Sequence, residues 1–368
     1  MKKNKKLDVS QQPENAPVTE TEEAVAVVTE NESLHGENLN DRVRVLSPGM
    51  MVAKRFFRSK LSLIGLIMLI ALFLFSFLGP VFSQWYVDGE RVKDTENITI
   101  IADVQAIEYT TEDGEKVIAY IITENADATV NANGDMTAEH LLGTDKSGYD
   151  LFTDLMLGGR VSLTIGFVVV LLETLLGVVL GGLAGYYGKW VDSLIMRIVD
   201  IISCIPTLPI MLILSAMFTS LGIVKMDRLY YMMIFLTFIG WGGIARLVRG
   251  QILSLREQEF MLAAKCSGLS TRKKIFRHLL PNVMPQLIVS MTMGLGSIIL
   301  MEATLGYLGL GAPLDVPTWG SMINTATDLI NVTANFWIPP GICITLAILA
   351  FNFVGEGLRD AFDPKMKR

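Results

Sequence analysis

The sequence is poor in the residues from which most enzyme and metal sites are built. Its 368 residues include three histidines and three cysteines, and only 18% are charged. His35, His140 and His278 lie far apart, without metal-ligand or catalytic spacing. The cysteines show no ligand pattern either, and we interpret them as small buried apolar residues in or beside apolar runs: Cys204, Cys266 and Cys343. No metal site is expected.

Several targeting and binding signals are also missing. The stretch Gly182–Lys189 has the wrong glycine spacing for a P-loop, and Trp190 stands where Ser or Thr is needed, so we expect no ATP hydrolysis and no cofactor in this chain. A cleavable signal peptide is not expected, because the first apolar run begins only at Leu61. No nucleic-acid-binding surface is indicated, and the net charge is -6.

What the chain has instead is long apolar runs. Hydrophobic residues make up 51% of it and the mean hydropathy is +0.44. A helix of about 20 apolar residues crosses a bilayer core. The sequence therefore predicts an all-α integral membrane protein with six transmembrane helices: Leu61–Phe82, Val161–Tyr187, Ile198–Leu221, Leu229–Val248, Val283–Leu310 and Phe336–Val354.

Two of these runs carry helix-packing signals. Gly177, Gly181 and Gly185 recur every four residues, which puts a smooth stripe on one helix face and favours close approach of another helix. Pro206 and Pro209 interrupt the third run and predict a kink there.

Basic residues beside the runs predict the orientation. They precede the first run, fill the loop after the fourth and follow the sixth, whereas the segment between the first two runs is acidic. Both termini are therefore expected in the cytoplasm. The basic residues that indicate this include Lys54, Arg55, Arg58, Lys60, Arg272, Lys273, Lys274, Arg277 and Arg359.

The chain divides by composition into five parts. Residues 1–45 are polar and predict a disordered cytoplasmic tail. Residues 46–83 hold a juxtamembrane segment and the first span, and 84–156 form a small β-containing extracellular insertion, with strands at 105–111 and 116–123 around Asp113 and Gly114. Residues 157–358 form a five-helix core with a cytoplasmic loop at 254–281, and 359–368 form a cytoplasmic tail.

The 254–281 loop predicts two short helices. Ser254 and Glu257 have the spacing of a capping box, and Gly268 is placed to end the first helix with positive φ. A second helix is expected to begin near Ser270 and to stop before Pro281. On the first, one aromatic and three small residues share a face that a partner's surface can approach: Phe260, Ala263, Ala264 and Ser267. From composition alone, a basic hairpin resting on anionic headgroups is an equal alternative.

The loop resembles the Glu-Ala-Ala coupling loop of binding-protein-dependent ABC transporter permeases. Leu262-Ala263-Ala264 takes the first place of that motif, Gly268 the glycine, and His278-Leu279-Leu280-Pro281 the end, with matching spacing. Leu262 replaces the usual Glu and His278 the usual Ile. Residues 141–364 are similar to the C-type subunit of oligopeptide and dipeptide permeases, through stretches that include 159–163, 184–192, 305–311, 317–320 and 357–364.

This resemblance implies a MetI-like permease core in a bacterial cytoplasmic membrane and a role as half of the pore of an ATP-driven peptide importer. The implied partners are a second permease subunit, two ABC ATPase subunits that bind ATP and Mg, an extracellular peptide-binding protein, a peptide substrate and the lipid bilayer. The implied ATPase-coupling residues are Phe260, Ala263, Ala264, Ser267, Gly268, Leu280 and Pro281. Related permeases handle dipeptides, longer peptides or nickel chelates.

Three acids within the apolar runs are candidates for a pore or gate, because charge inside a membrane is costly and usually functional. They are Glu302, Glu173 and Asp200. For Glu173, a hydrogen bond to a neighbouring helix is slightly favoured. The same three acids would serve as a relay in a self-sufficient channel or proton-coupled carrier. A receptor that binds ligand through the outer segment is a third hypothesis, but no signalling domain follows the sixth run.

Overall fold

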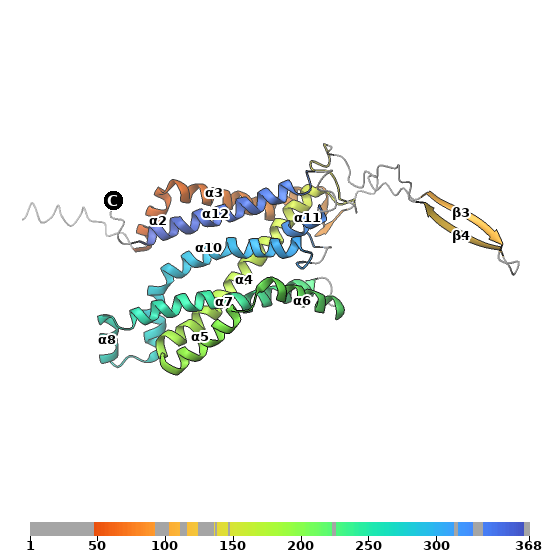
Figure 1. The fold of residues 1–368 in the computed structure, drawn as a ribbon. Helices are drawn as coiled ribbons and strands as arrows, with labels where there is room; N and C mark the ends of the chain where they lie inside the picture. The colour runs from red at the N-terminus through yellow and green to blue at the C-terminus, as the bar shows by residue number, and fades with distance from the viewer. Residues whose placement is uncertain are drawn as a thin grey trace, which may run out of the picture. The chain divides into compact units, whose positions relative to one another are not determined.

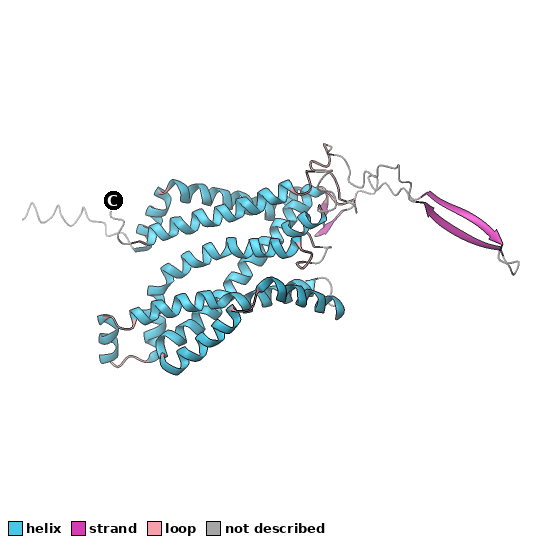
Figure 2. Ribbon diagram, in the orientation of Figure 1, coloured by secondary structure: helices cyan, strands magenta, loops and turns pink. Residues whose placement is uncertain are grey.

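The computed structural model describes residues 48–92, 103–110, 116–123, 136, 138–145, 148–222, 226–312, 316–326 and 334–363 (Figures 1 and 2). The tail 1–45, the turn at Asp113 and Gly114, and residues 364–368 lie outside this part. The chain divides into two units, Met1–Met51 and Val52–Arg368, and the second unit contains nearly all described elements.

The long helices occupy five of the six predicted spans. α3 (Lys60–Phe73) continues through η1 (Leu74–Leu78) and η2 (Gly79–Phe82); α4 is Leu151–Tyr187, α7 is Met226–Leu255, α10 is Leu280–Tyr307 and α12 is Ile338–Phe362. Each is long and apolar enough to cross a bilayer. α4 and α12 extend beyond the predicted runs, because their polar ends continue the helix outside the apolar stretch. Shorter helices flank them: α2 (Pro48–Arg58), α8 (Glu259–Cys266), α9 (Thr271–Lys273) and α11 (Trp319–Thr325).

The third predicted span is a broken helix pair. α5 (Lys189–Ser203) and α6 (Thr207–Ser220) meet at a bend of 76°, with Pro206 in the break. Proline lacks the amide hydrogen that would continue the helix, so the predicted kink is confirmed. The span begins earlier than predicted, at Lys189, because α5 is amphipathic and its charged residues interrupt the apolar run. The described part of the chain therefore has up to six spans if the bent pair counts as one.

The glycine stripe of α4 lies against α7, as predicted. A Cβ at Gly181 would approach the Ala245 Cα to 2.8 Å, and a Cβ at Gly185 would approach the Ile252 Cβ to 2.9 Å. Gly177 likewise faces Ile244 at 2.7 Å. Because these neighbours include backbone atoms, the helices can pack this closely only without side chains on α4.

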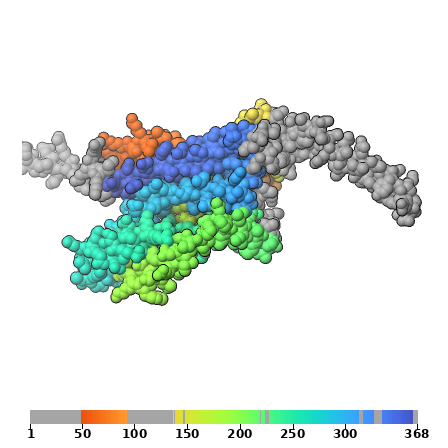
Figure 3. Space-filling view, in the orientation of Figure 1, coloured from red at the N-terminus to blue at the C-terminus, as the bar shows by residue number. Residues whose placement is uncertain are grey.

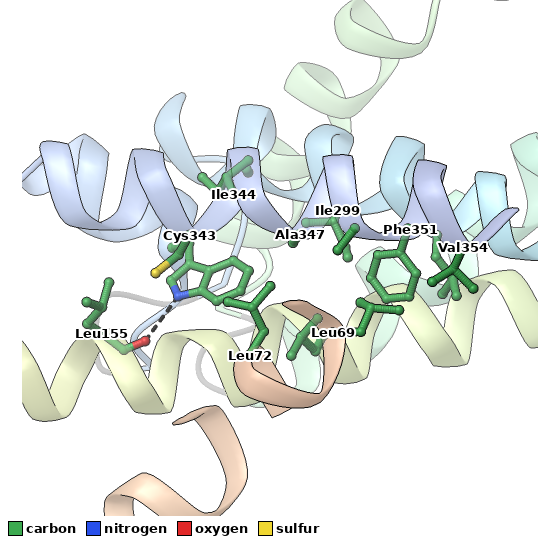
Figure 4. Close-up of a cluster of buried hydrophobic side chains, with 14 of the residues drawn as sticks. Leu69, Leu72, Leu155, Ile299, Cys343, Ile344, Ala347, Phe351 and Val354 are labelled. Atoms are coloured by element: carbon green, nitrogen blue, oxygen red, sulfur yellow. Dashed lines mark hydrogen bonds between the residues drawn. The ribbon is translucent and has the colours of Figure 1, made fainter. Parts of the chain in front are cut away.

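Another apolar core joins α3, α4, α10 and α12. Figure 4 shows Leu69 and Leu72 of α3 facing Ala347 and Phe351 of α12, with Ile299 of α10 beside them. In the space-filling view, α12 and α10 lie next to each other on the visible face (Figure 3). Cys343 belongs to this core, whereas Cys204 and Cys266 are exposed, which corrects the prediction that all three cysteines are buried.

The outer segment contains two hairpins. β3 (Asp103–Thr110) pairs antiparallel with β4 (Lys116–Thr123), with Gln105 opposite Ile121, which confirms the predicted strands. A second hairpin, β1 (Tyr86–Val87) and β2 (Glu90–Arg91) around Asp88 and Gly89, was not predicted from the sequence. Both turn residues have positive φ, and an Asp-Gly pair is a strong signal for such a turn.

Candidate functional site

The helix α8 of the 254–281 loop ends at the glycine that the sequence indicated. Gly268 has φ +68°, its N–H donates to the Lys265 carbonyl at 3.1 Å, and the Leu269 N–H donates to the Ala264 carbonyl at 3.3 Å. These two bonds form a Schellman motif, which requires a left-handed residue that glycine adopts without strain. The loop therefore reverses sharply between α8 and α9.

The predicted capping box is wrong. Ser254 lies in the last turn of α7, which continues to Leu255, and α8 begins only at Glu259 after Gln258, whose side chain makes no capping hydrogen bond. The apolar pattern of α7 extends to Ile252, a fully buried residue, so packing keeps the helix going past the serine.

The predicted docking face of α8 is partly buried. Phe260, Ala263 and Ser267 are exposed, whereas Ala264 is only 5% exposed. At about 100° per residue, Ala264 lies between Phe260 and Met261, and Met261 is fully buried in a cluster with Leu279 and others. Met261 and Ala264 thus attach α8 to the rest of the chain, and the other three residues face outward.

The second arm of the loop begins where predicted but does not stop before Pro281. α9 begins at Thr271 after Ser270, continues through a π-helix, η3 (Lys274–Leu279), and runs on into α10. Pro281 sits in the first turn of α10, directly after the π-helix, so its missing N–H falls at the junction of the two helices. Leu280 is half-buried and Pro281 is exposed.

Arginines near the end of α7 and just after it bind to neighbouring helices. Arg249 donates two hydrogen bonds to the Asp192 carboxylate of α5, one of them at 2.7 Å, and Arg256 donates to the Gly185 carbonyl at 3.0 Å. Arg246 pairs with Asp200 at 3.0 Å. The pairing of Arg249 with Asp192 was not predicted from the sequence.

Glu173 and Asp200, two of the three candidate acids, lie in different surroundings. Glu173 is 7% exposed and packs directly against Gly240 of α7, with no hydrogen-bond partner for its Oε1. The Asp200 side chain is 59% exposed and forms the ion pair with Arg246. Asp200 therefore faces open surroundings, while Glu173 belongs to the α4–α7 interface.

Glu302 is completely buried beside the short helix α11. The hydroxyl groups of Ser162 on α4 and of Thr318, the N-cap of α11, lie near its carboxyl, but neither carboxyl oxygen has a hydrogen-bond partner among the described residues. Both hydroxyls already accept backbone N–H groups: Ser162 from Trp319 at 3.3 Å and Thr318 from Ser321 at 3.1 Å. Their own hydrogens are therefore oriented by the rest of the structure and available to the Glu302 carboxyl.

α11 packs between α4 and α10. Trp319 is fully buried and donates from its ring to the Leu155 carbonyl at 3.0 Å, the dashed line at Leu155 in Figure 4. A Cβ at Gly320 would meet the Ala303 Cα at 2.7 Å. The stretch 317–320 entered the sequence-based predictions only through a resemblance. The local signal for the packing of α11 was a Trp-Gly pair shortly after a proline.

Nothing in the described part of the chain suggests a metal centre, since no cluster of three His, Cys, Asp or Glu side chains is present there. The three candidate acids are also not joined to one another by hydrogen bonds among the described residues.

The chain matches two family models. Residues 177–368 match the binding-protein-dependent transport system inner membrane component, and residues 47–98 match the N-terminal transmembrane domain of oligopeptide transport permease C. The first model alone covers more than half of the chain.

Curated relatives agree with these matches. A dipeptide transport system permease protein of Alkalihalophilus pseudofirmus is 40% identical over 68% of this chain and 81% of its own length. An oligopeptide transport system permease protein of Bacillus subtilis is 32% identical over 85% of this chain and 88% of its own. A dipeptide permease protein of the same organism is 33% identical over 86% and 85%.

Proposed function

Because the chain belongs to the family of binding-protein-dependent transport system inner membrane components, we propose that it is the membrane-spanning permease subunit of an ATP-driven importer of dipeptides or oligopeptides. The named functions of the relatives support the peptide substrate. The long apolar helices support a place within the membrane, and we assign it to the bacterial cytoplasmic membrane with both termini inside.

The proposed coupling role rests on α8, a short helix followed by a sharp turn at Gly268. Met261 and Ala264 fix one side of this helix to the cluster around Leu279, so motion imposed on α8 reaches the start of α10. The other side presents Phe260, Ala263 and Ser267 outward, and the small residues leave room for a partner's surface. Gly268 sets the angle between α8 and the next helix.

In this proposal, two ATPase subunits supply the energy that the chain does not supply itself. They bind ATP and Mg, and closure of the ATPase pair pushes α8 and hence the membrane helices between inward-facing and outward-facing arrangements. A second, homologous permease completes the pore, and an extracellular binding protein delivers the peptide. Coupling by a docked helix needs a rigid attachment of that helix, which its buried side provides.

An affinity purification from membranes tests the coupling role, with the full chain as bait. Ala263→Asp places a charge on the outward face of α8, and Lys265→Asp, on the opposite side of the helix, is the matched control. We expect ATPase subunits and a second permease to co-purify with the wild type and the control. The ATPases should be lost from Ala263→Asp while the second permease remains.

Two results would count against the proposal. If no ATPase accompanies the wild-type chain in any mild detergent, the chain does not work as a permease subunit of this kind. If the purified chain alone moves peptide or protons across liposomes, the carrier hypothesis takes its place.

A further inference from the structure

The first turns of the helix that leads into α10 carry an uncompensated positive charge. Arg272, Lys273 and Arg277 are exposed, and none of them has an ion-pair partner within the part of the chain that the structure describes. The arginines near the end of α7 differ, because Arg246 and Arg249 are each paired with an aspartate of α5. The unpaired cations are therefore available to an anion from outside the chain.

These cations line a groove. It has a volume of about 580 Å³ and is formed by Ser270, Arg272, Lys273, Phe276, Arg277 and Pro281. The π-helix η3 explains the lining, because its i→i+5 hydrogen bonds bring residues four to five apart onto one face. This spacing separates Arg272 from Phe276 and Arg277, and it separates these two residues from Pro281. The opposite face, with Leu279 and Val283, is fully buried.

The groove has its cations in the first two turns of the helix, with Phe276 among them, and an apolar residue after Arg277. Arg272 and Lys273 stand at the start of the candidate span Thr271–Tyr307; Phe276, 63% exposed, lies one turn further, and Met284, 38% exposed, lies beyond Pro281. A phospholipid has the same order, with an anionic phosphate at the membrane surface and apolar chains beneath it. Guanidinium groups suit phosphate because they donate two parallel hydrogen bonds.

We propose that this groove binds the headgroup of an anionic phospholipid, with Arg272 and Arg277 on the phosphate, Lys273 beside it and Phe276 against the upper acyl chains. The position at the start of a candidate span favours a lipid over a protein partner, because the exposed Phe276 and Met284 put apolar surface beside and beyond the cations. The site requires only that Thr271–Tyr307 spans the bilayer, so it is independent of which substrate the chain transports.

Fluorescence quenching tests the site. The reporter is Phe276→Trp in the full chain, co-expressed with its partner subunits and placed in vesicles of phosphatidylcholine with a minor fraction of phosphatidylglycerol. Its quenching is the difference from the unsubstituted chain, which has five tryptophans of its own. Bromine is attached to the acyl chains of one lipid or of the other. We expect brominated phosphatidylglycerol to quench the reporter out of proportion to its fraction, and this preference to fall roughly fivefold for each cation removed in Arg272→Ser and Arg272→Ser/Arg277→Ser.

The matched control removes equal charge from exposed positions of α5, with Lys189→Asn/Arg197→Gln, and should leave the preference unchanged. Quenching in proportion to lipid fraction, equal for both lipids, would overturn the proposal. So would the absence of quenching by either lipid in the assembled complex, which would mean that a protein covers the groove. Since the readout does not involve transport, a failed peptide-import assay would leave this result intact.

Discussion

At the residue scale, the fold depends on positions where one added atom has no room. The α4–α7 interface is built on glycines, but they are not equivalent. Gly181 faces the backbone of Ala245, whereas the adjacent Gly182 has only the Ile252 Cδ1 at 3.8 Å from its ideal Cβ, which is ordinary contact. Two neighbouring glycines therefore differ in what they contribute to helix packing.

Gly181→Ala should destabilise the chain by about 1–3 kcal/mol, because backbone atoms cannot move aside for the new methyl group. Gly182→Ala should be neutral or slightly stabilising, since alanine favours helix and the space is open. Thermal unfolding of the two purified variants in detergent measures the difference. Equal melting temperatures would show that α4 and α7 are not packed this closely.

The complete burial of Glu302 changes the role that the sequence suggested for this acid. It was a candidate for a pore or gate from sequence, and the structure encloses it between Ser162 and Thr318, behind the fully buried Trp319. A side chain so enclosed meets no solvent in this conformation. The arrangement instead favours a role in packing α11 against α4 and α10, with Ser162 and Thr318 fixed beside the carboxyl by the backbone N–H groups that they accept.

Glu302→Gln should keep both the fold and peptide uptake, because the amide has nearly the same size and shape as the carboxyl. Glu302→Ala should cost about 2–5 kcal/mol, since it leaves a cavity at a completely buried position. Thermal unfolding and uptake, measured on the same preparations, separate the effects. Loss of uptake in a fully stable Glu302→Gln protein would instead point to a proton carried by this residue, as the carrier hypothesis requires.

At the element scale, the apolar runs predicted five of the helices well, because a bilayer demands a length that composition reveals. Sequence reasoning failed where local signals competed with packing. Ser254 and Glu257 match a capping box, yet the burial of Ile252 continues α7 past the serine. Pro281 suggested a helix end, but it lies at the junction of a π-helix and α10, and the helix continues through it.

Some features of the candidate site were likewise predicted correctly and others were not. Gly268 ends α8 as expected, because a left-handed cap has a clear residue preference. The four-residue docking face included a buried residue, because the sequence alone does not show which side of α8 is covered, and Ala264 is buried on the same side as Met261. Asp192 was missed as the partner of Arg249 because the two lie 57 residues apart.

The link between α5 and α7 should depend mainly on that missed pair. Arg249 and Asp192 are 34% and 16% exposed and share two hydrogen bonds, so a double-mutant cycle with alanine should give a coupling of about 1–3 kcal/mol. Arg246 and Asp200, 45% and 59% exposed, join the same helices with one bond and should give less than about 1 kcal/mol. Unfolding of the four variants in each cycle measures both.

Arg249→Lys serves as a further variant in the first cycle, because lysine keeps the charge but not the paired geometry. It should lose most of the coupling. Equal coupling in the two cycles would mean that solvent screens both pairs alike and that α5 is held by its apolar contacts, such as those of Val199 with Gly242.

At the scale of the whole chain, the decisive property is which loops share a side of the membrane. Gly357 of α12 packs against Ser62 of α3, and Arg256 at the end of α7 contacts Gly185 at the end of α4. At the opposite end of α4, Arg91 pairs with Asp154 at 3.0 Å. The basic flanks and the 254–281 loop thus lie at one end of the helices, and the β1–β2 hairpin lies at the other (Figure 1).

Cysteine labelling in intact cells tests this arrangement. Cys266 on α8 is exposed and should react with a membrane-impermeant maleimide only after lysis, in a chain whose other exposed cysteine is removed by Cys204→Ser. Val87→Cys on β1, where the side chain is 51% exposed, should react in intact cells when combined with Cys266→Ser. Labelling of Cys266 without lysis would reverse the topology. It would also place α8 beyond the reach of any cytoplasmic ATPase, so the coupling proposal depends on this outcome as much as on the purification of partners.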